Sequence, residues 1–155
     1  MSKLPHLTIR RAGPADAAAV RSLTRDAYAQ WIPVIGREPL PMKADYEKAV
    51  REHEIDLLYV DEQLVALIEV FPTADHLFIE NIAVSSGHQG KGLGRHLLRH
   101  AEAKAGSAGL AELRLLTNQA FATNVRLYQS VGFRIDRTEP HFGGTTVYMS
   151  KQLAE

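Results

Sequence analysis

The sequence predicts a mixed α/β (α+β) domain built on a single, mostly antiparallel sheet. Two observations support this fold class. Apolar runs of strand length alternate with longer segments in which apolar residues recur at helical spacing. One helical segment, from about residue 92 to residue 105, separates two predicted strands, and a strand–helix–strand connection makes those strands parallel. The 155 residues are expected to form one domain, 1–155, large enough to bury a core without disulfides.

Composition narrows the class of function. Lys and Arg number 18 and Asp and Glu number 18, so the formal net charge is zero and no overall field attracts nucleic acid or a membrane. The absence of cysteine excludes disulfides, thiolate metal sites and a cysteine nucleophile. The first residues do not read as a signal peptide, and the apolar runs are too short to span a bilayer. These features predict a soluble, cytoplasmic protein with no nucleic-acid or membrane partner.

The N-terminal half is predicted to contain a strand, two helices and a β-hairpin. In order, the elements are a strand (7–12), a helix (from Gly13-Pro14 to Trp31), a loop (31–42), a short helix (44–54) and two strands (57–60 and 64–71). Pro14 suits the first position of a helix, and Asp16 in the first turn suits the helix dipole. The segment 31–42 is predicted to be a loop because its prolines cannot continue the preceding helix.

The C-terminal half is predicted to alternate strands and helices before closing with a hairpin. In order, the elements are a strand (76–84), a helix (about 92–105), a strand (112–118), a helix (121–131) and two strands (133–138 and 145–151). Gly132 is expected to end the second of these helices, because glycine readily takes the left-handed conformation that follows a helix.

The stretch SSGHQGKGLGRHLL, residues 85–98, carries glycine at every second position from 90 to 94, where a helix begins. Glycine lowers helix propensity by about 1 kcal/mol relative to alanine, so these glycines serve another purpose. The free N–H groups of a helix N-terminus form an anion site, and glycine lets a phosphate approach the backbone. Lys91 and Arg95, one helical turn apart, add positive charge. The stretch predicts a phosphate or pyrophosphate site.

The segment QGKGLG, residues 89–94, matches the Q/R-x-x-G-x-G/A signature of the GNAT N-acetyltransferase superfamily, whereas the P-loop and dinucleotide motifs do not fit. Residues 80–105 resemble that family's fourth strand, pyrophosphate loop and third helix. NVRLYQSVGF, residues 124–133, resembles its fourth helix, which carries Tyr four residues before Gly-Phe. The resemblance covers nearly the whole chain, strongly over 77–133 and weakly before 55. It implies the GNAT fold, in which parallel strands 4 and 5 splay around acetyl-CoA and about four helices flank the sheet.

The resemblance implies an acetyl-CoA-dependent N-acetyltransferase that moves the acetyl group directly to a primary amine of a small molecule or peptide. It assigns coenzyme A binding to Ile82, Ala83, Val84, Gln89, Gly90, Lys91, Gly92, Leu93, Gly94, Arg95, Asn118, Asn124 and Tyr128. Asn118 and Asn124 are included because Phe121 stands where many members carry an asparagine that contacts the pantetheine. By analogy with the family, a homodimer is expected.

The catalytic residues implied by the resemblance are Tyr128, as the general acid for the leaving thiolate, and Glu80, as the general base through a water chain. His76 is the second candidate for the base, because the unperturbed pKa of imidazole lies near neutrality. A backbone N–H near Ala83 is expected to stabilise the oxyanion. No metal is expected: His96 and His100 have no evident third ligand and are assigned to a solvated helix face.

The acceptor pocket is expected to lie under the first helix, the proline-rich loop and the second helix. Its predicted lining residues are Tyr28, Trp31, His76 and Glu80, and Glu38 and Asp45 are candidates for a local acidic patch. Two alternatives stay open: a non-catalytic acyl-CoA-binding or sensing module, and a protein N-terminal or lysine acetyltransferase. Tyr128 together with a strand 4 carboxylate favours an enzyme.

Overall fold

A computed structural model describes residues 6–153. The strands are β1 (Leu7–Arg11), β2 (Glu54–Val60), β3 (Gln63–Pro72), β4 (Leu77–Val84), β5 (Glu112–Asn118), β6 (Arg134–His141) and β7 (Gly144–Gln152). The α-helices are α1 (Ala17–Tyr28), α2 (Ile32–Ile35), α3 (Tyr46–Glu52), α4 (Leu93–Ser107) and α5 (Ala122–Ser130). The 3₁₀ turns are η1 (Pro14–Asp16), η2 (Ala29–Trp31), η3 (Leu40–Lys43) and η4 (Ser86–His88).

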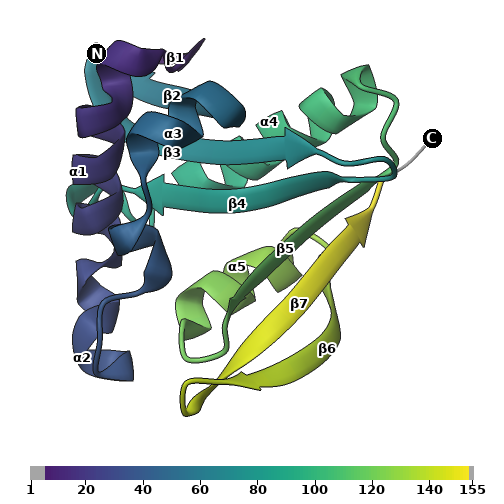
Figure 1. The fold of residues 1–155 in the computed structure, drawn as a ribbon. Helices are drawn as coiled ribbons and strands as arrows, with labels where there is room; N and C mark the ends of the chain where they lie inside the picture. The colour runs from purple at the N-terminus through teal and green to yellow at the C-terminus, as the bar shows by residue number, and fades with distance from the viewer. Residues whose placement is uncertain (1–5, 154–155) are drawn as a thin grey trace, which may run out of the picture.

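The described strands form one mixed sheet in the order β1-β2-β3-β4-β5-β7-β6 (Figure 1). Only β4 and β5 run parallel, as the helical connection between them predicts, and every other neighbouring pair is antiparallel. The parallel pairing is short: it joins 77–79 to 113–115 and stops there. Beyond Ile79 the two strands diverge, which leaves a V-shaped gap in the middle of the sheet (Figure 1).

A β-bulge in β4 lies where the parallel pairing ends. Opposite β3, Asn81 pairs with Glu69 and Ile79 pairs with Val70, so Glu80 is an extra residue in β4. A bulge of this kind bends the strand and shifts the side-chain alternation by one residue. Before the bulge, Ile79 packs in the apolar cluster on the face of the sheet that α4 covers. Beyond the bulge, Ile82 packs against the same cluster, whereas strict alternation would have placed Asn81 there.

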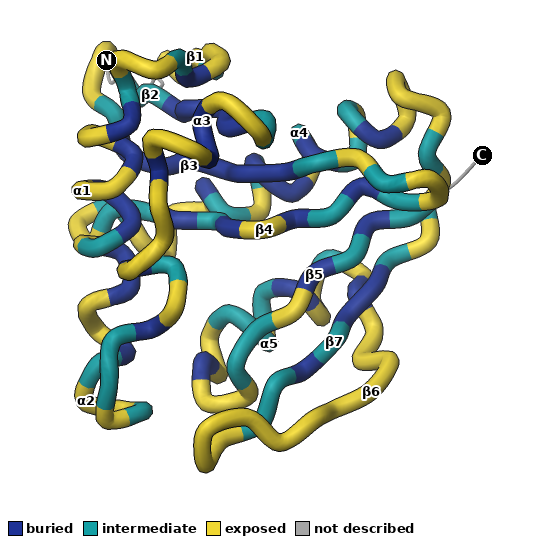
Figure 2. Tube along the Cα trace, in the orientation of Figure 1, coloured by how far each residue is buried: buried dark blue, intermediate teal, exposed yellow. Residues whose placement is uncertain are grey.

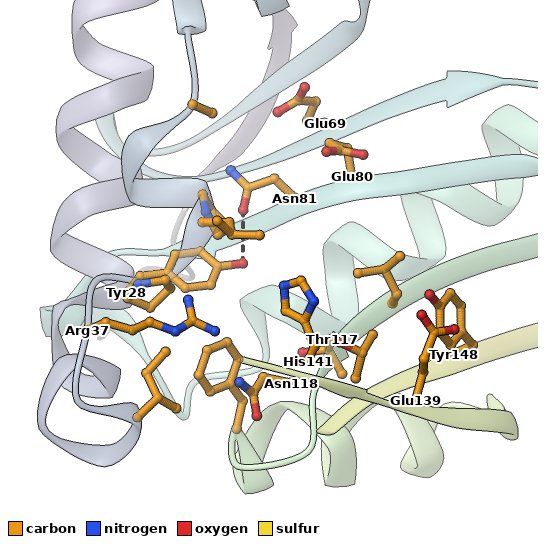
Figure 3. A pocket seen from close by; sticks show the side chains of 18 of the residues that line it. Tyr28, Arg37, Glu69, Glu80, Asn81, Thr117, Asn118, Glu139, His141 and Tyr148 are labelled. Carbon is orange, nitrogen blue, oxygen red and sulfur yellow. Dashed lines mark hydrogen bonds between the residues drawn. The ribbon is translucent and has the colours of Figure 1, made fainter. Parts of the chain in front are cut away.

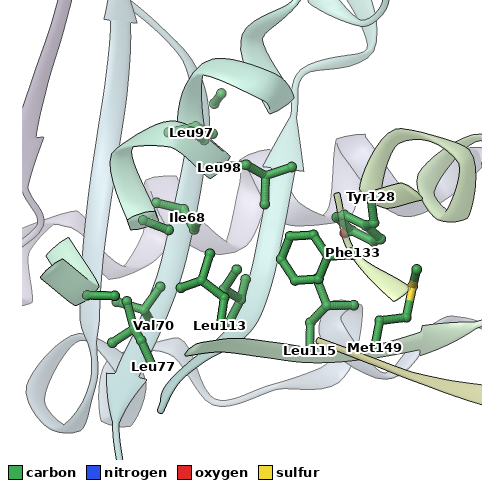
Figure 4. Packing of buried hydrophobic residues seen from close by; sticks show 14 of the residues in the cluster. Ile68, Val70, Leu77, Leu97, Leu98, Leu113, Leu115, Tyr128, Phe133 and Met149 are labelled. Carbon is green, nitrogen blue, oxygen red and sulfur yellow. The ribbon is translucent and has the colours of Figure 1, made fainter. Parts of the chain in front are cut away.

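Two apolar clusters cover the two faces of the sheet. On one face, α4 and α5 pack on β3, β4, β5 and β7, with fully buried Leu97 and Leu113 near the centre (Figure 4). On the other face, α1 and α3 pack on β2, β3 and the end of β4. The edge strand β6 is exposed along its whole length (Figure 2). The diverging half of β4 therefore lies between two helical layers.

The prediction of a loop over 31–42 is wrong for its first part. Helix α1 continues through η2 into the short helix α2, in which Pro33 occupies one of the first two positions and so loses no helical hydrogen bond. Gly36, with φ of 76°, takes the left-handed conformation and ends α2. Within residues 6–153, no helix is long and apolar enough to cross a membrane.

Candidate active site

Two cavities flank the gap between β4 and β5. The first, here the glycine-loop cavity, has a volume of about 430 Å³ and lies against the 88–95 loop, α5 and the end of β4. The second, the acidic cavity, has a volume of about 440 Å³ and lies under α2, η3 and the β6–β7 hairpin (Figure 3). Both volumes suit a small ligand or one arm of a larger one. Tyr28 lines both cavities, so they adjoin.

Backbone geometry prepares the glycine loop for an anion. Gly90 and Gly92 have φ of 78° and 85°, a conformation that side-chain-bearing residues rarely adopt. Gly92 caps α4, and the first backbone bond of this helix runs from the His96 N–H to the Gly92 carbonyl at 3.0 Å. The amides of 93–95 precede that bond, so the helix N-terminus offers free donors and a positive dipole end.

Side chains hold this loop on the sheet. The Gln89 amide donates to the Val84 carbonyl at 3.0 Å, and its oxygen accepts from Gln30 at 3.0 Å. Gly94 has a role that the sequence did not predict: a Cβ at this position would lie 2.9 Å from Cδ2 of Leu127. A side chain at residue 94 would therefore require the Leu127 side chain of α5 to shift, so Gly94 also contributes to the packing of α4 against α5.

Most of the predicted coenzyme A residues gather on the glycine-loop cavity. Those that line it are Ile82, Val84, Gln89, Gly90, Gly92, Leu93, Gly94, Arg95, Asn124 and Tyr128. Three others do not. Ala83 packs in the α1 cluster, Asn118 lines the acidic cavity, and Lys91 is exposed beside the loop.

Tyr128 is buried, with 7% of its surface exposed, and its ring lies 5.9 Å from that of Phe133. Burial raises the pKa of its phenol to about 12. The phenol is therefore protonated at neutral pH, and it borders the glycine-loop cavity. A protonated hydroxyl at this place can donate a hydrogen bond into the cavity.

Two carboxylates lie together on the β3–β4 side of the acidic cavity (Figure 3). Glu80 projects there from the bulge, and burial, followed by the charge of Glu69, raises the pKa of its carboxyl. Glu69 is 3% exposed, and burial raises the pKa of its carboxyl although Oε2 lies 2.6 Å from Nδ1 of His53. His53 stacks on Phe71 with ring centroids 4.6 Å apart. The sequence did not identify Glu69 or His53 as site residues.

A buried polar network holds β4 against α1. Asn81 is 4% exposed; its oxygen accepts from the Tyr28 hydroxyl at 3.0 Å, and its amide donates to Thr24 at 3.2 Å. The Tyr46 hydroxyl, 3.4 Å from that amide, donates to the Pro41 carbonyl at 2.7 Å. Because every member of the network is bonded, it holds this part of β4 in a fixed position relative to α1. Tyr28 was predicted to line the acceptor pocket, whereas Asn81 was not identified.

Other predicted positions lie elsewhere. His76 lines neither cavity; its Nδ1 lies 2.7 Å from Asp75 and 2.9 Å from Thr73, at the far end of β4. Trp31 is on the glycine-loop cavity, stacked 4.9 Å from Phe121.

Three further expectations need correction. Glu38 and Asp45 do not form the acidic patch: Glu38 pairs with Arg25 at 2.8 Å, and Asp45 caps α3. His100 is only partly solvated: its side chain is 27% exposed, and its Nε2 lies 2.7 Å from the buried carboxylate of Asp56.

Comparison with known proteins agrees with this geometry. The sequence model that defines the acetyltransferase (GNAT) family matches residues 19–133. Streptothricin acetyltransferase of Streptomyces lavendulae is 42% identical over 57 residues, which are 37% of this chain and 30% of that protein. N-acetyltransferase family 8 member 3 of Rattus norvegicus is 33% identical over 78 residues, 46% of this chain and 34% of that protein. The chain thus matches about a third of the length of these two relatives.

A solved structure shows the same fold. The PaiA N-acetyltransferase of Thermoplasma acidophilum, in complex with coenzyme A, aligns with a TM-score of 0.82 at 17% identity, over 95% of this chain and 99% of that one. This likeness, together with the mixed sheet, confirms the predicted fold class.

Proposed function

Because the chain belongs to the GNAT acetyltransferase family, we propose that it transfers the acetyl group of acetyl-CoA directly to a primary amine of a small molecule. One observation carries the proposal: a helix N-terminus with free amides and a pair of carboxylates line two adjoining cavities at the gap between β4 and β5. An acyl donor and an amine could reach each other there. With no cysteine in the sequence, no acetyl-cysteine can carry the group between them.

The glycine-loop cavity suits coenzyme A. The amides of 93–95 and the side chain of Arg95 would hold the pyrophosphate. The β4 backbone beyond Ile79 has no β5 partner, so the pantetheine arm could bond to it as an added strand does. Acetyl-CoA supplies a thioester, an acyl donor that an amine can attack.

Glu80 is proposed as the general base. An alkylammonium acceptor has a pKa of about 10.4 and must lose a proton before it attacks. The raised pKa of Glu80 lies closer to the pKa of the ammonium than that of an ordinary glutamate does, which favours proton transfer from the ammonium to Glu80. Glu69 keeps the pKa of Glu80 raised by its charge, and its bond to His53 links the cavity to a half-exposed imidazole. His76 receives no catalytic role in this proposal, because it lines neither cavity and its Nδ1 is bonded to Asp75.

Tyr128 is proposed to stabilise the leaving thiolate. A thiol has a pKa of about 8.5, whereas burial raises that of Tyr128 to about 12. Complete proton transfer from phenol to thiolate is therefore uphill. A hydrogen bond from the phenol to the sulfur, as negative charge develops there, is the favourable form of assistance.

The test is calorimetric titration with acetyl-CoA, followed by a thiol-release screen of the same sample against amines and peptides. Micromolar binding of acetyl-CoA, together with release of its thiol when a small amine is added, supports the proposal. Binding without release on the whole panel would favour a non-catalytic acyl-CoA sensor. Release with peptides alone would favour a protein N-terminal or lysine acetyltransferase.

A further inference from the structure

The acidic cavity carries opposite charges on opposite sides. Glu69 and Glu80 lie on the β3–β4 side, whereas Arg37 enters from the segment after α2 (Figure 3). A simple amine needs only the carboxylate side. The guanidinium therefore calls for its own explanation.

Arg37 is held in place by its neighbours. Gly36 ends α2 in a left-handed conformation, which turns the chain at that point. The next residue, Glu38, pairs with Arg25 of α1 at 2.8 Å, and Arg25 also donates to the Met42 carbonyl at 2.9 Å. Two contacts to α1 thus anchor the segment that follows Arg37. The guanidinium itself lies 5.3 Å from the centre of the Phe142 ring, at the tip of the β6–β7 hairpin.

The charge of Arg37 is not neutralised within the described residues, since no carboxylate of 6–153 lies within 4.0 Å of its guanidinium. The remaining carboxylate on this side, Glu139, already pairs with Arg137 at 2.6 Å. Contact with an aromatic face leaves the edge N–H groups of a guanidinium free to bind an anion. Arg37 can therefore receive a ligand carboxylate in a bidentate fork.

We propose that the acceptor is an amino acid, a primary amine that carries a carboxylate on the same molecule. Its ammonium lies at Glu80 and Glu69, and its carboxylate at Arg37. The cavity wall also includes Ile35, Leu40 and Pro41, which suits the apolar carbon of such a ligand. This inference rests on the proposed function. It excludes polyamines as preferred acceptors, because a second cation would meet Arg37.

The test compares acceptors in pairs that differ only in the carboxylate: L-leucine and L-leucinamide, L-lysine and cadaverine, 4-aminobutyrate and propylamine, with spermidine added. Thiol release gives kcat and KM for the wild type, for Arg37→Gln and for Arg51→Gln. The control arginine is exposed on α3 and lines neither cavity. Phe142→Ala is a second variant that keeps Arg37 but removes its support.

In at least one pair, the wild type should prefer the carboxylate-bearing member by roughly tenfold to a hundredfold in kcat/KM, the range of one charged hydrogen-bonded contact. Arg37→Gln should bring that ratio near one by raising KM, Phe142→Ala should reduce it in part, and Arg51→Gln should preserve it. Equal use of both members in every pair, a preference for spermidine, or an unchanged ratio in Arg37→Gln overturns the inference and leaves the transferase intact. If acetyl-CoA binds but no acceptor of the panel gives thiol release, the proposed function is overturned as well.

Discussion

Replacing Gly92 by alanine should destabilise the protein through backbone conformation alone. Gly92 has φ of 85°, and a Cβ there would meet no heavy atom within 4 Å. An L-residue in this left-handed conformation costs about 1–2 kcal/mol. For a chain of this size the loss corresponds to a decrease of about 2–8 °C in Tm. No steric term adds to it, because the space is open.

The assay is urea unfolding of a series of glycine variants, followed by calorimetric titration with acetyl-CoA. Gly92→Asn should recover most of the stability, because asparagine tolerates the left-handed conformation and is a good N-cap. Gly87→Ala is the matched control: its Cβ also meets open space, but its φ is not positive. Acetyl-CoA affinity should fall in both Gly92 variants, since any side chain there obstructs the loop that we assign to the pyrophosphate.

Two results would refute this reasoning. If Gly87→Ala loses as much stability as Gly92→Ala, then conformation at residue 92 is not the cause. If Gly92→Asn binds acetyl-CoA as tightly as the wild type, then the pyrophosphate does not lie against this residue.

The remaining predictions concern catalysis and the network that supports the site. Tyr128→Phe should lower turnover on the order of tenfold to a hundredfold with acetyl-CoA affinity preserved; unchanged steady-state turnover would remove its phenol from the reaction. Glu80 can act as a base only when it is ionised. Because its pKa is raised, wild-type activity should be lost as the pH falls through a pKa higher than that of an ordinary glutamate. Glu80→Gln should be slow and lack that acidic limb in kcat/KM; an unaltered limb would assign the base to Glu69. Tyr28→Phe should lower the free energy of unfolding in urea by about 1–3 kcal/mol, because the buried Asn81 oxygen loses its donor. Tyr59→Phe should lower it less, because the Tyr59 hydroxyl accepts from an exposed arginine. Equal losses in the two variants would contradict this account.

Connectivity made the fold and the glycine loop predictable. A helix between two strands requires them to be parallel, and the glycine pattern marks a helix N-terminus. The same reasoning could predict the site around Glu80 only in part. Alternation in FIENIAV gives no sign of the bulge, because a bulge depends on the register with β3 and not on β4 alone.

The acidic cavity could not be derived from the sequence for two physical reasons. Glu69 lies in the apolar run LVALIEVF, where both faces are buried and periodicity does not tell which face its carboxylate takes. Arg37 follows a glycine in the proline-rich segment, and its position depends on the distant contact between Glu38 and Arg25. Long-range pairs of this kind leave no local pattern.

Because of the bulge, Glu80 should tolerate substitution better than its two neighbours in β4. Ile79 and Asn81 are both buried, one in each layer, so substitution at either position disturbs packing. Glu80 belongs to neither alternation, and its side chain is exposed to the cavity. The fold can thus accept many residues at this position while keeping its stability. Saturation mutagenesis at residue 80 alone would therefore change the chemistry of the acidic cavity, the proposed acceptor site, without redesigning the scaffold.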